Sequence, residues 1–360
     1  MVGRIRLPRV LVAALVGAAL AVTGAPDEQS LPGHAGTAPP VTDGAVVSVG
    51  CSPSAGELQM RAVRIDRHGG PEVLAPADVP EPRPDDAEVL VRVIASAINP
   101  VDDKTREGAI GEGTPPLPMT LGWELAGIVV DPGPSGLPVG ERVFGMSHQL
   151  ASGRGSWADL VAMPAASIAV APSSASLVEA ATLPLPGLTA LQTLDWLQAG
   201  PGDKLLVAGA AGAVGGLAVQ LARARGVQVD ALVSRQAQIE VVRELGAGHA
   251  TTDRTTLPVG GYDAVFDTFG AFVTDAVADG GRYASIATQA GPVPDLSHRA
   301  VRTTVNQVRE DGRGLAELAA AVDGGRLKIR VGAQYAVRDV KAAHERFQRG
   351  NLNGKIALIF

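Results

Sequence analysis

The feature that most constrains the fold is residues 205–215, where an apolar strand-like run ends in a glycine- and alanine-rich turn and a helical pattern begins. Gly209, Gly212 and Gly215 recur at every third position of this turn. The middle glycine lets the backbone approach a pyrophosphate, and the last one lets the helix pack close to the strand. The helix N-terminus offers an anion free N–H groups and the positive end of the helix dipole. The pattern predicts a phosphate-binding loop of the dinucleotide type.

The end of the following strand-like run indicates which dinucleotide would bind. An NAD enzyme usually places Asp or Glu there, to accept hydrogen bonds from the ribose hydroxyls. This chain has Ser234 and Arg235 instead. A hydroxyl and a guanidinium suit a 2′-phosphate, so NADPH is the expected cofactor. A solvated surface arginine is the alternative interpretation of Arg235, and the missing acid is the stronger half of the argument.

From Met60 onward the chain shows two kinds of pattern. The first consists of short β-type runs separated by Gly and Pro turns, which is typical of a β-rich barrel or sandwich. These runs are 60–66, 88–98, 126–130 and 141–144. After Gly202, strand-like and helical runs alternate, which predicts right-handed βαβ units and a parallel sheet. The strand-like runs are 204–208, 227–233, 263–267 and 282–287, the helical runs between them are 213–225 and 237–245, and further helices are expected at 176–198, 314–323 and 339–348.

Residues 1–59 differ from the rest of the chain. Arginines precede the apolar run 11–22 and small residues follow it, which is the order of a secretory signal. The run is too short to span a bilayer comfortably. Residues 26–59 show no helix or strand period and are typical of a disordered linker. Three interpretations stay open: a genuine export signal, an upstream start with Met60 as the true first residue, and an apolar helix that packs on the protein.

Composition narrows the function classes. The net charge is −6, so the chain has no basic footprint for nucleic acid. Cys51 is the only cysteine, which excludes an internal disulfide and a multi-cysteine zinc site. A lipid anchor at Cys51 is discounted because Ser48 stands where an aliphatic residue is wanted. We therefore expect neither a nucleic-acid partner nor a stable membrane anchor.

Several segments, taken in order and with their spacings, resemble the medium-chain dehydrogenase/reductase superfamily, specifically its zinc-free quinone oxidoreductase branch. Besides the glycine loop they are RHGGPEVL at 67–74, NPVD at 99–102, GWELAG at 122–127, ERVFG at 141–145, GSWAD at 155–159, LPLPGLTA at 183–190, FDTFG at 266–270 and GKIAL at 354–358. The resemblance implies an α/β fold with a β-rich, GroES-like catalytic domain at 60–180 and a doubly wound Rossmann domain at 181–325. Residues 326–360 would return to the catalytic domain, and the cofactor would lie in the cleft.

The resemblance also assigns site residues. It implies that Asn99 and Thr189 contact the nicotinamide end of NADPH, with Asn99 also facing the substrate. Phe269 and Ile286 would wall the nicotinamide. The pyrophosphate would be held by Gly209, Ala210, Ala211, Gly212, Ala213 and Val214, and the 2′-phosphate by Ser234 and Arg235. Lys104 is the second candidate catalytic residue beside Asn99, for stabilising an enolate or binding ribose; a solvated loop residue is an equal alternative.

No metal site is expected. Zinc-dependent relatives use Cys, His and Glu, and this chain has Asn99 and Trp123 at the first two of these positions, which leaves Glu124 without companions. Without a Lewis acid the oxidation of an alcohol is hard, which favours reduction of an already electrophilic acceptor.

The resemblance thus implies an NADPH-dependent, zinc-free oxidoreductase that transfers hydride to a quinone or an activated alkene such as an enone. An enoyl-thioester reductase and a non-catalytic NADPH-binding protein stay open as alternatives. The expected partner is a small electrophilic molecule, and a homodimer is left open. The expected location is cytoplasmic, with export through the N-terminal segment as the alternative.

Overall fold

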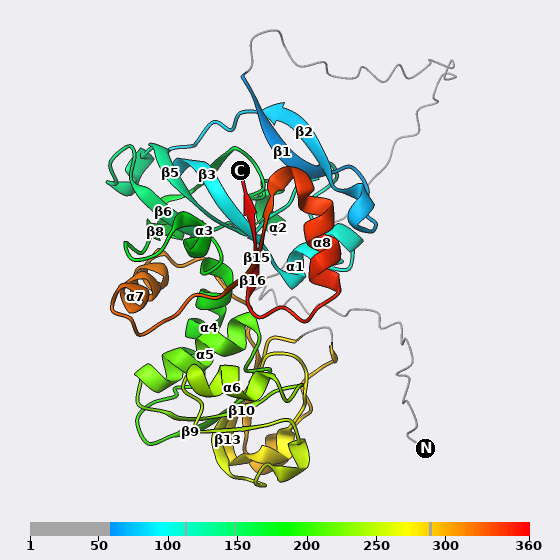
Figure 1. Cartoon of the computed structure of the whole chain (residues 1–360), viewed down its shortest axis with the longest axis vertical. Helices are drawn as coiled ribbons and strands as arrows, with labels where there is room; N and C mark the ends of the chain where they lie inside the picture. Colours follow the sequence, from blue (N-terminus) through cyan, green and yellow to red (C-terminus); the bar gives the residue numbers. More distant parts are fainter. Residues whose placement is uncertain (1–57, 112–113, 148, 288–289) are drawn as a thin grey trace, which may run out of the picture. The chain divides into compact units, whose positions relative to one another are not determined.

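The computed structural model describes residues 58–111, 114–147, 149–287 and 290–360 (Figure 1). The signal, linker and lipid-anchor interpretations, including Cys51, concern residues outside these ranges. Gln59–Phe360 forms one unit, which contains all the elements described below.

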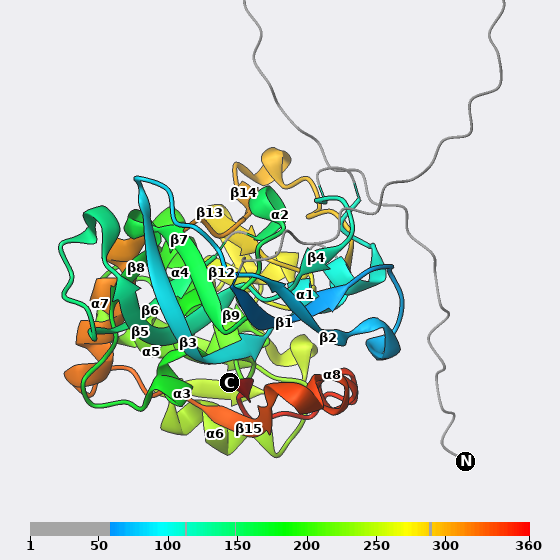
Figure 2. The same cartoon turned by 90° about the horizontal axis from the view of Figure 1, so that it is seen from above.

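The β-rich part is built around the long strand β3 (Glu88–Ile98). β3 pairs antiparallel with β5 (Glu124–Asp131) and with β16 (Lys355–Ile359), so the end of the chain joins this sheet. The strand order is β15-β16-β3-β5-β6-β8, with β7 paired to β3; Figure 1 labels β16, and Figure 2 labels the other strands. The remaining bounds are β6 (Arg142–Met146), β7 (Leu160–Pro164), β8 (Ile168–Val170) and β15 (Val331–Ala336). A smaller sheet, β2-β1-β4, consists of β1 (Gln59–Ile65), β2 (Ala75–Pro80) and β4 (Met119–Thr120).

The sequence of β3 explains its central position. In its first half Val91 and Val93 are buried while Arg92 between them is exposed, which is the period of two of a strand with one covered face. Its second half, residues 95–98, is buried throughout. The strand therefore delivers the next residue, Asn99, into the interior of the protein, where it is 2% exposed.

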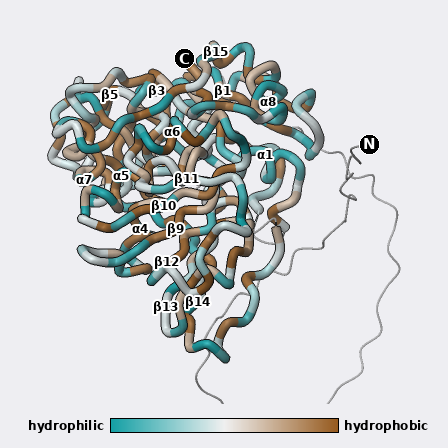
Figure 3. Tube along the Cα trace, turned by 60° about the horizontal axis from the view of Figure 1, so that its bottom comes forward, coloured by the Kyte–Doolittle hydropathy of each residue, from teal (hydrophilic) through white to brown (hydrophobic). Residues whose placement is uncertain are grey.

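The second sheet is parallel, with the strand order β11-β10-β9-β12-β13-β14. Its strands are β9 (Lys204–Ala208), β10 (Gln228–Leu232), β11 (His249–Thr251), β12 (Tyr262–Asp267), β13 (Val277–Ser285) and β14 (Arg302–Val305). Residues 205–208 are fully buried, as expected for a parallel strand covered on both faces, and Figure 3 shows the apolar character of this sheet. The strand order reverses between β9 and β12, and ligands of such sheets bind beyond the carboxyl ends of the strands at this switch point.

Helices follow the parallel strands and connect the two sheets. α5 (Ala213–Ala224) follows β9, and α6 (Gln238–Glu244) follows β10. The other helices are α1 (Pro100–Glu107), α2 (Gln149–Ser152), α3 (Leu177–Ala180), α4 (Pro184–Trp196), α7 (Gly312–Asp323) and α8 (Val340–Gln348). Within the described ranges, no helix combines the length and the apolar character needed to span a bilayer.

The structure differs from the sequence-based expectations at several places, and three of the differences have a plain physical reason. The single helix expected at 176–198 is two helices, because Pro184 lacks the N–H needed to continue a helix and begins α4 instead. The strand expected at 282–287 begins earlier, at Val277, where β13 already pairs with Tyr262 of β12. The edge strands β11 and β14 were not expected, since their short, largely polar sequences carry little strand signal of their own.

Candidate functional site

The glycine loop lies at the carboxyl end of β9, at the switch point of the parallel sheet. Gly209 has a φ of 78°, a left-handed conformation that favours glycine, and a Cβ there would lie 2.3 Å from Thr268 Oγ1. A Cβ at Gly215 would lie 2.3 Å from the carbonyl oxygen of Gly209. These two glycines therefore allow the turn itself and the close packing of α5 on it.

Gly212 differs from its two neighbours in the pattern. Its φ is −68°, so the strain that a positive φ would impose on a substitution is absent. A Cβ built on it would meet only the carbonyl oxygen of Gly209, at 3.2 Å. Gly212 thus faces open space in front of the N-terminus of α5, which is where a ligand phosphate would approach.

The first turn of α5 presents donors with nothing to bind. In the part of the chain that the structure describes, the N–H groups of Ala213, Val214 and Gly215 have no hydrogen-bond partner, and the first intrahelical bond comes from Gly216 to the Gly212 carbonyl, at 3.0 Å. Unpaired N–H groups and the positive end of a helix dipole together make an anion site.

The end of β10 carries the pair expected to select the cofactor. The Ser234 hydroxyl and backbone N–H both donate to Gln238 Oε1 at 3.2 Å, which holds Ser234 in the turn before α6. Arg235 is half-buried, and among the described residues its guanidinium has no ion pair or hydrogen bond. A guanidinium without a carboxylate partner is available to a phosphate.

A buried polar cluster forms where β3, β5 and β16 meet. Asn99, which caps the N-terminus of α1, donates from Nδ2 to Glu124 Oε1 at 2.8 Å. The ammonium of Lys355 lies 2.9 Å from the same carboxylate oxygen and donates to Asn99 Oδ1 and, at 2.7 Å, to the Ile98 carbonyl. The Lys355 cation therefore neutralises Glu124, and both ends of the Asn99 amide are fixed.

The cluster continues into α4. Glu124 Oε2 accepts the backbone N–H of Leu185 at 2.8 Å, and one turn later the Thr189 hydroxyl donates to the Leu185 carbonyl at 2.6 Å. Asn99 and Thr189, which are 90 positions apart in sequence, are thus joined through Glu124 and Leu185. The structure therefore brings together the two residues that were expected to contact the nicotinamide end.

Asp102 is a second acid beside this cluster. It accepts the Asn99 backbone N–H at 2.8 Å, and it is fully buried. Burial raises the pKa of Asp102 to about 8, against the lowering effect of the Asn99 N–H and the Lys355 charge. When the Asp102 carboxyl is neutral, it does not compete with Glu124 for the positive charge of Lys355.

The remaining candidates lie on separate elements. Lys104 is in α1 and not in a loop, it is half-buried, and burial lowers the pKa of its ammonium. Phe269 is 48% exposed and lies in the turn after β12. In this turn the N–H groups of Phe269 (3.2 Å) and Gly270 (2.8 Å) donate to Asp267 Oδ1. Ile286 follows β13 and donates its N–H to the Asp267 carbonyl at 3.2 Å. Phe269 and Ile286 are therefore brought to the same sheet edge as the glycine loop.

Sequence reasoning missed Lys355. The residue belongs to the GKIAL segment that carried the resemblance, so the signal was present, but nothing in the sequence shows that the ammonium reaches across to Asn99, 256 positions earlier. Asp102 was likewise part of a recognised segment without being assigned a role.

A zinc ion does not fit the cluster. Neither the Asn99 amide nor the Trp123 indole is a usual zinc ligand, and both oxygens of Glu124 are already hydrogen-bonded. Over the described ranges, no three His, Cys, Asp or Glu side chains are grouped so as to hold a metal ion. In this cluster the Glu124 carboxylate forms its ion pair with the Lys355 ammonium.

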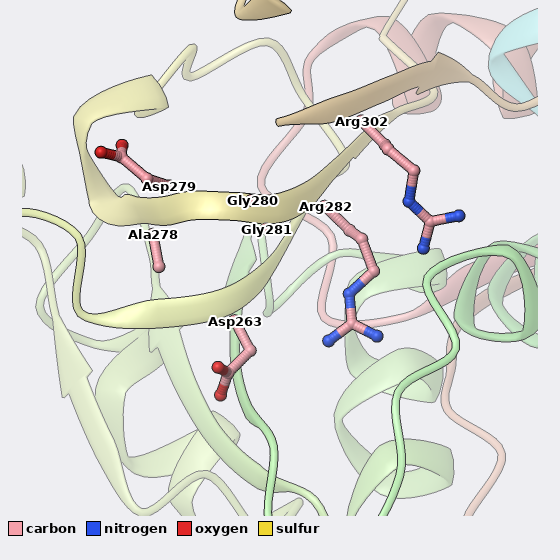
Figure 4. Close-up of a pocket in the computed structure, with 7 residues that line it drawn as sticks. All are labelled: Asp263, Ala278, Asp279, Gly280, Gly281, Arg282 and Arg302. Carbon is pink, nitrogen blue, oxygen red and sulfur yellow. The ribbon is translucent and has the colours of Figure 1, made fainter. Parts of the chain in front are cut away.

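A surface hollow of about 250 Å³ lies elsewhere, between the amino ends of the strands of the parallel sheet (Figure 4). Its two arginines are already partnered: Arg282 Nη2 lies 3.2 Å from Asp203 Oδ2, and Arg302 Nη2 donates to Gln198 Oε1 at 3.0 Å. Because the glycine loop is at the opposite ends of these strands, the hollow is not part of the candidate site.

Comparisons with known proteins agree with this arrangement. The family model of the alcohol dehydrogenase GroES-like domain matches residues 85–173, and the family model of the zinc-binding dehydrogenase matches residues 240–358. A 2-methylene-furan-3-one reductase of Solanum lycopersicum is 30% identical over 315 residues, which cover 83% of this chain and 79% of the relative.

Solved structures show the same architecture. The quinone oxidoreductase from Coxiella burnetii superposes with a TM-score of 0.76 at 27% identity, over 84% of this chain and 100% of that one. A mycobacterial protein complexed with NADPH superposes with a TM-score of 0.72 at 28% identity, over the same shares of the two chains. The expected fold, with a GroES-like part and a Rossmann part, is confirmed. The chain belongs to the medium-chain dehydrogenase/reductase superfamily, in its quinone oxidoreductase-like branch.

Proposed function

We propose that this chain is an NADPH-dependent oxidoreductase that delivers hydride to the carbonyl of a quinone or to the β-carbon of an activated alkene. The observation that carries the proposal is the glycine loop at the switch point, where a Cβ at Gly212 would meet only one atom and where, among the described residues, the N–H groups of Ala213, Val214 and Gly215 have no partner. The relatives support the reaction class, since one of them is named a reductase of an enone and another a quinone oxidoreductase.

The pyrophosphate and the 2′-phosphate of the cofactor have different partners in the protein. The loop from Gly209 to Val214 holds the pyrophosphate through backbone N–H groups. Ser234 and Arg235 hold the 2′-phosphate, because no acid stands at the end of β10 to select the ribose hydroxyls of NADH. The NADPH complex of the mycobacterial relative supports the same choice.

Bound NADPH supplies the hydride, and the protein contributes orientation and electrostatics. Asn99 and Thr189 contact the nicotinamide end, and the Lys355–Glu124 pair fixes the Asn99 amide in one orientation. Phe269 and Ile286 wall the nicotinamide from the parallel-sheet side. Lys104, a half-buried residue of α1, stabilises negative charge on the reduced acceptor.

The functional enzyme starts near Met60 and works in the cytosol, where NADPH is regenerated. Met60 is the second residue of β1 (Gln59–Ile65), so a chain that starts there keeps all but one residue of this strand. A homodimer and the domain limits at residues 180 and 325 remain predictions of the same proposal.

The decisive experiment follows NADPH oxidation with an ortho-quinone, an enone and an enoyl thioester, with product identification and NADH as the matched cofactor control. We expect turnover of the quinone or the enone, faster with NADPH, by protein that contains no stoichiometric zinc on elemental analysis. Tight NADPH binding without turnover of any acceptor would establish a non-catalytic binder. Turnover of the thioester alone would make the alternative reductase correct.

A further inference from the structure

Arg330 reaches the glycine loop from the far end of the sequence. It lies between α7 and β15, and its Nη2 donates to the carbonyl oxygens of Gly212 (2.8 Å) and Ala211 (3.1 Å). A Cβ at Gly216 would lie 2.3 Å from the same Nη2. The guanidinium therefore occupies the space that the missing side chain of Gly216 leaves on the first turn of α5.

This cation has no counter-ion in the part of the chain that the structure describes. Among the described residues Arg330 forms no ion pair, and its buried Nη1 has no hydrogen-bond partner. Burial lowers the pKa of the Arg330 guanidinium, and no carboxylate raises it. A half-buried cation that has no anion among the described residues is unfavourable, and its position beside the positive end of the α5 dipole makes it more so.

The contact with an anion would not be direct. Ala213, Arg330 and Lys355 help to line a hollow of about 20 Å³, which has room for roughly one water molecule and not for a phosphate. The guanidinium bonds to the carbonyls of Ala211 and Gly212, and the next two residues, Ala213 and Val214, carry N–H groups that have no partner among the described residues. The positive charge of Arg330 therefore acts on an anion at these N–H groups through the intervening loop backbone.

We propose that Arg330 is a positioning cation for the pyrophosphate of the cofactor: it braces the loop carbonyls and supplies a positive charge that remains uncompensated until the pyrophosphate binds. This proposal rests on the proposed function, because it requires NADPH at the glycine loop. It assigns Arg330 to the part shared by NADPH and NADH, whereas Arg235 acts on the 2′-phosphate alone.

The test is Arg330→Gln in the full chain, with Arg142→Gln as the matched control. Arg142 is also half-buried and also donates to a backbone carbonyl, that of Ala175 at 2.7 Å, but it lies on β6 in the other sheet. The measurements are the thermal melting of the cofactor-free protein and the dissociation constants of NADPH and NADH at low and high salt.

We expect Arg330→Gln to weaken the binding of both cofactors by the same factor, about tenfold, because a positive charge near the pyrophosphate is lost. The salt dependence of binding should decrease. The cofactor-free variant should melt no lower than the unchanged protein, because an uncompensated buried charge has been removed. Arg330→Lys keeps the charge and should recover most of the affinity, and Arg142→Gln should bind both cofactors normally.

Other outcomes would overturn the assignment. A lower melting temperature with unchanged affinity would make Arg330 a structural brace only. Loss of NADPH affinity with NADH unaffected would place its action at the 2′-phosphate. The proposed function is tested separately by Gly212→Val: if that variant keeps full NADPH affinity, the loop is not the cofactor site, whatever Arg330 does.

Discussion

The glycine loop and the cluster around Asn99 are polar sites of opposite kinds. At the loop the donors are backbone N–H groups, and in the described structure those of Ala213, Val214 and Gly215 have no partner. In the cluster the polar groups are side chains that bond to one another: Glu124 accepts from Asn99 and Lys355 on one oxygen and from the Leu185 N–H on the other.

This difference separates binding from support. Unsatisfied donors at the surface of a turn gain free energy when an anion arrives, so the loop is completed by a ligand. A buried cluster whose groups are already paired gains nothing from a metal ion, because binding the ion would break the hydrogen bonds between those groups. The cluster therefore orients the Asn99 side chain, and the glycine loop binds the phosphate groups of a ligand. The following predictions test this contrast.

The largest effect is expected for Gly212→Val. A side chain there would fill the space that the phosphate must enter, so NADPH affinity should be lost. The cofactor-free fold should tolerate the change, because φ is −68° and the nearest neighbour of a Cβ is the Gly209 oxygen at 3.2 Å. Melting curves with and without NADPH check this: the unchanged protein should melt higher with NADPH, and the variant should not respond. A full NADPH-dependent shift in the variant would contradict the loop assignment.

Lys355→Met should destabilise the protein by about 3–5 kcal/mol, because it leaves the Glu124 carboxylate buried without its cation. The double variant Glu124→Gln with Lys355→Met should recover much of this loss, since neither charge is then buried. Urea unfolding of the two variants measures the difference. Equal losses in the single and double variants would show that the pair is not coupled in the way its geometry suggests.

Asp102 should make stability depend on pH. Its pKa is raised in the folded state to about 8, above its value in the unfolded chain, so between about pH 4 and pH 8 the folded protein holds a proton that the unfolded chain has lost. The free energy of unfolding should therefore fall as pH rises through this range, by at most about 1.4 kcal/mol per pH unit. Asp102→Asn should flatten the profile, while the exposed Asp275→Asn should leave it as it is. An unchanged slope in Asp102→Asn would contradict the raised pKa.

Arg235→Asp should weaken NADPH binding by about 1.5–3 kcal/mol, the worth of a charge-assisted hydrogen bond, and leave NADH binding no weaker. The ratio of the two dissociation constants measures this directly. If the unchanged protein binds both cofactors equally, Ser234 and Arg235 do not select the 2′-phosphate.

The smallest effect is expected for Gly216→Ala. In most helices this change stabilises by about 0.5–1 kcal/mol. Here the new methyl would displace the Arg330 guanidinium, so the melting temperature should hold or rise while NADPH affinity falls a few-fold. Gly215→Ala is the contrasting variant and should lower the melting temperature. Its Cβ would lie 2.3 Å from loop backbone, and backbone cannot move aside as a flexible side chain can. A Gly216→Ala variant with unchanged affinity would argue against a role for Arg330 at the loop.

The sequence determined the features that depend on neighbouring residues. A strand, a glycine turn and a helix are contiguous, so the loop from Gly209 to Gly215 was predictable, and so was the alternation that makes the sheet around β9 parallel. The absence of an acid at Ser234–Arg235 is likewise a local fact. The helix break at Pro184 was visible in principle, but the apolar period continued across it and concealed the two helices.

Tertiary structure alone decided which distant groups meet. Edge strands β11 and β14 are strands because a neighbour offers them hydrogen bonds, not because their sequences demand it. Lys355 joins Asn99 because β16 returns beside β3, and Arg330 reaches Gly212 because the chain crosses α5 on its way to β15. Charge, burial and partner choice at these residues follow from packing between segments more than a hundred positions apart, and local sequence carries no record of that packing.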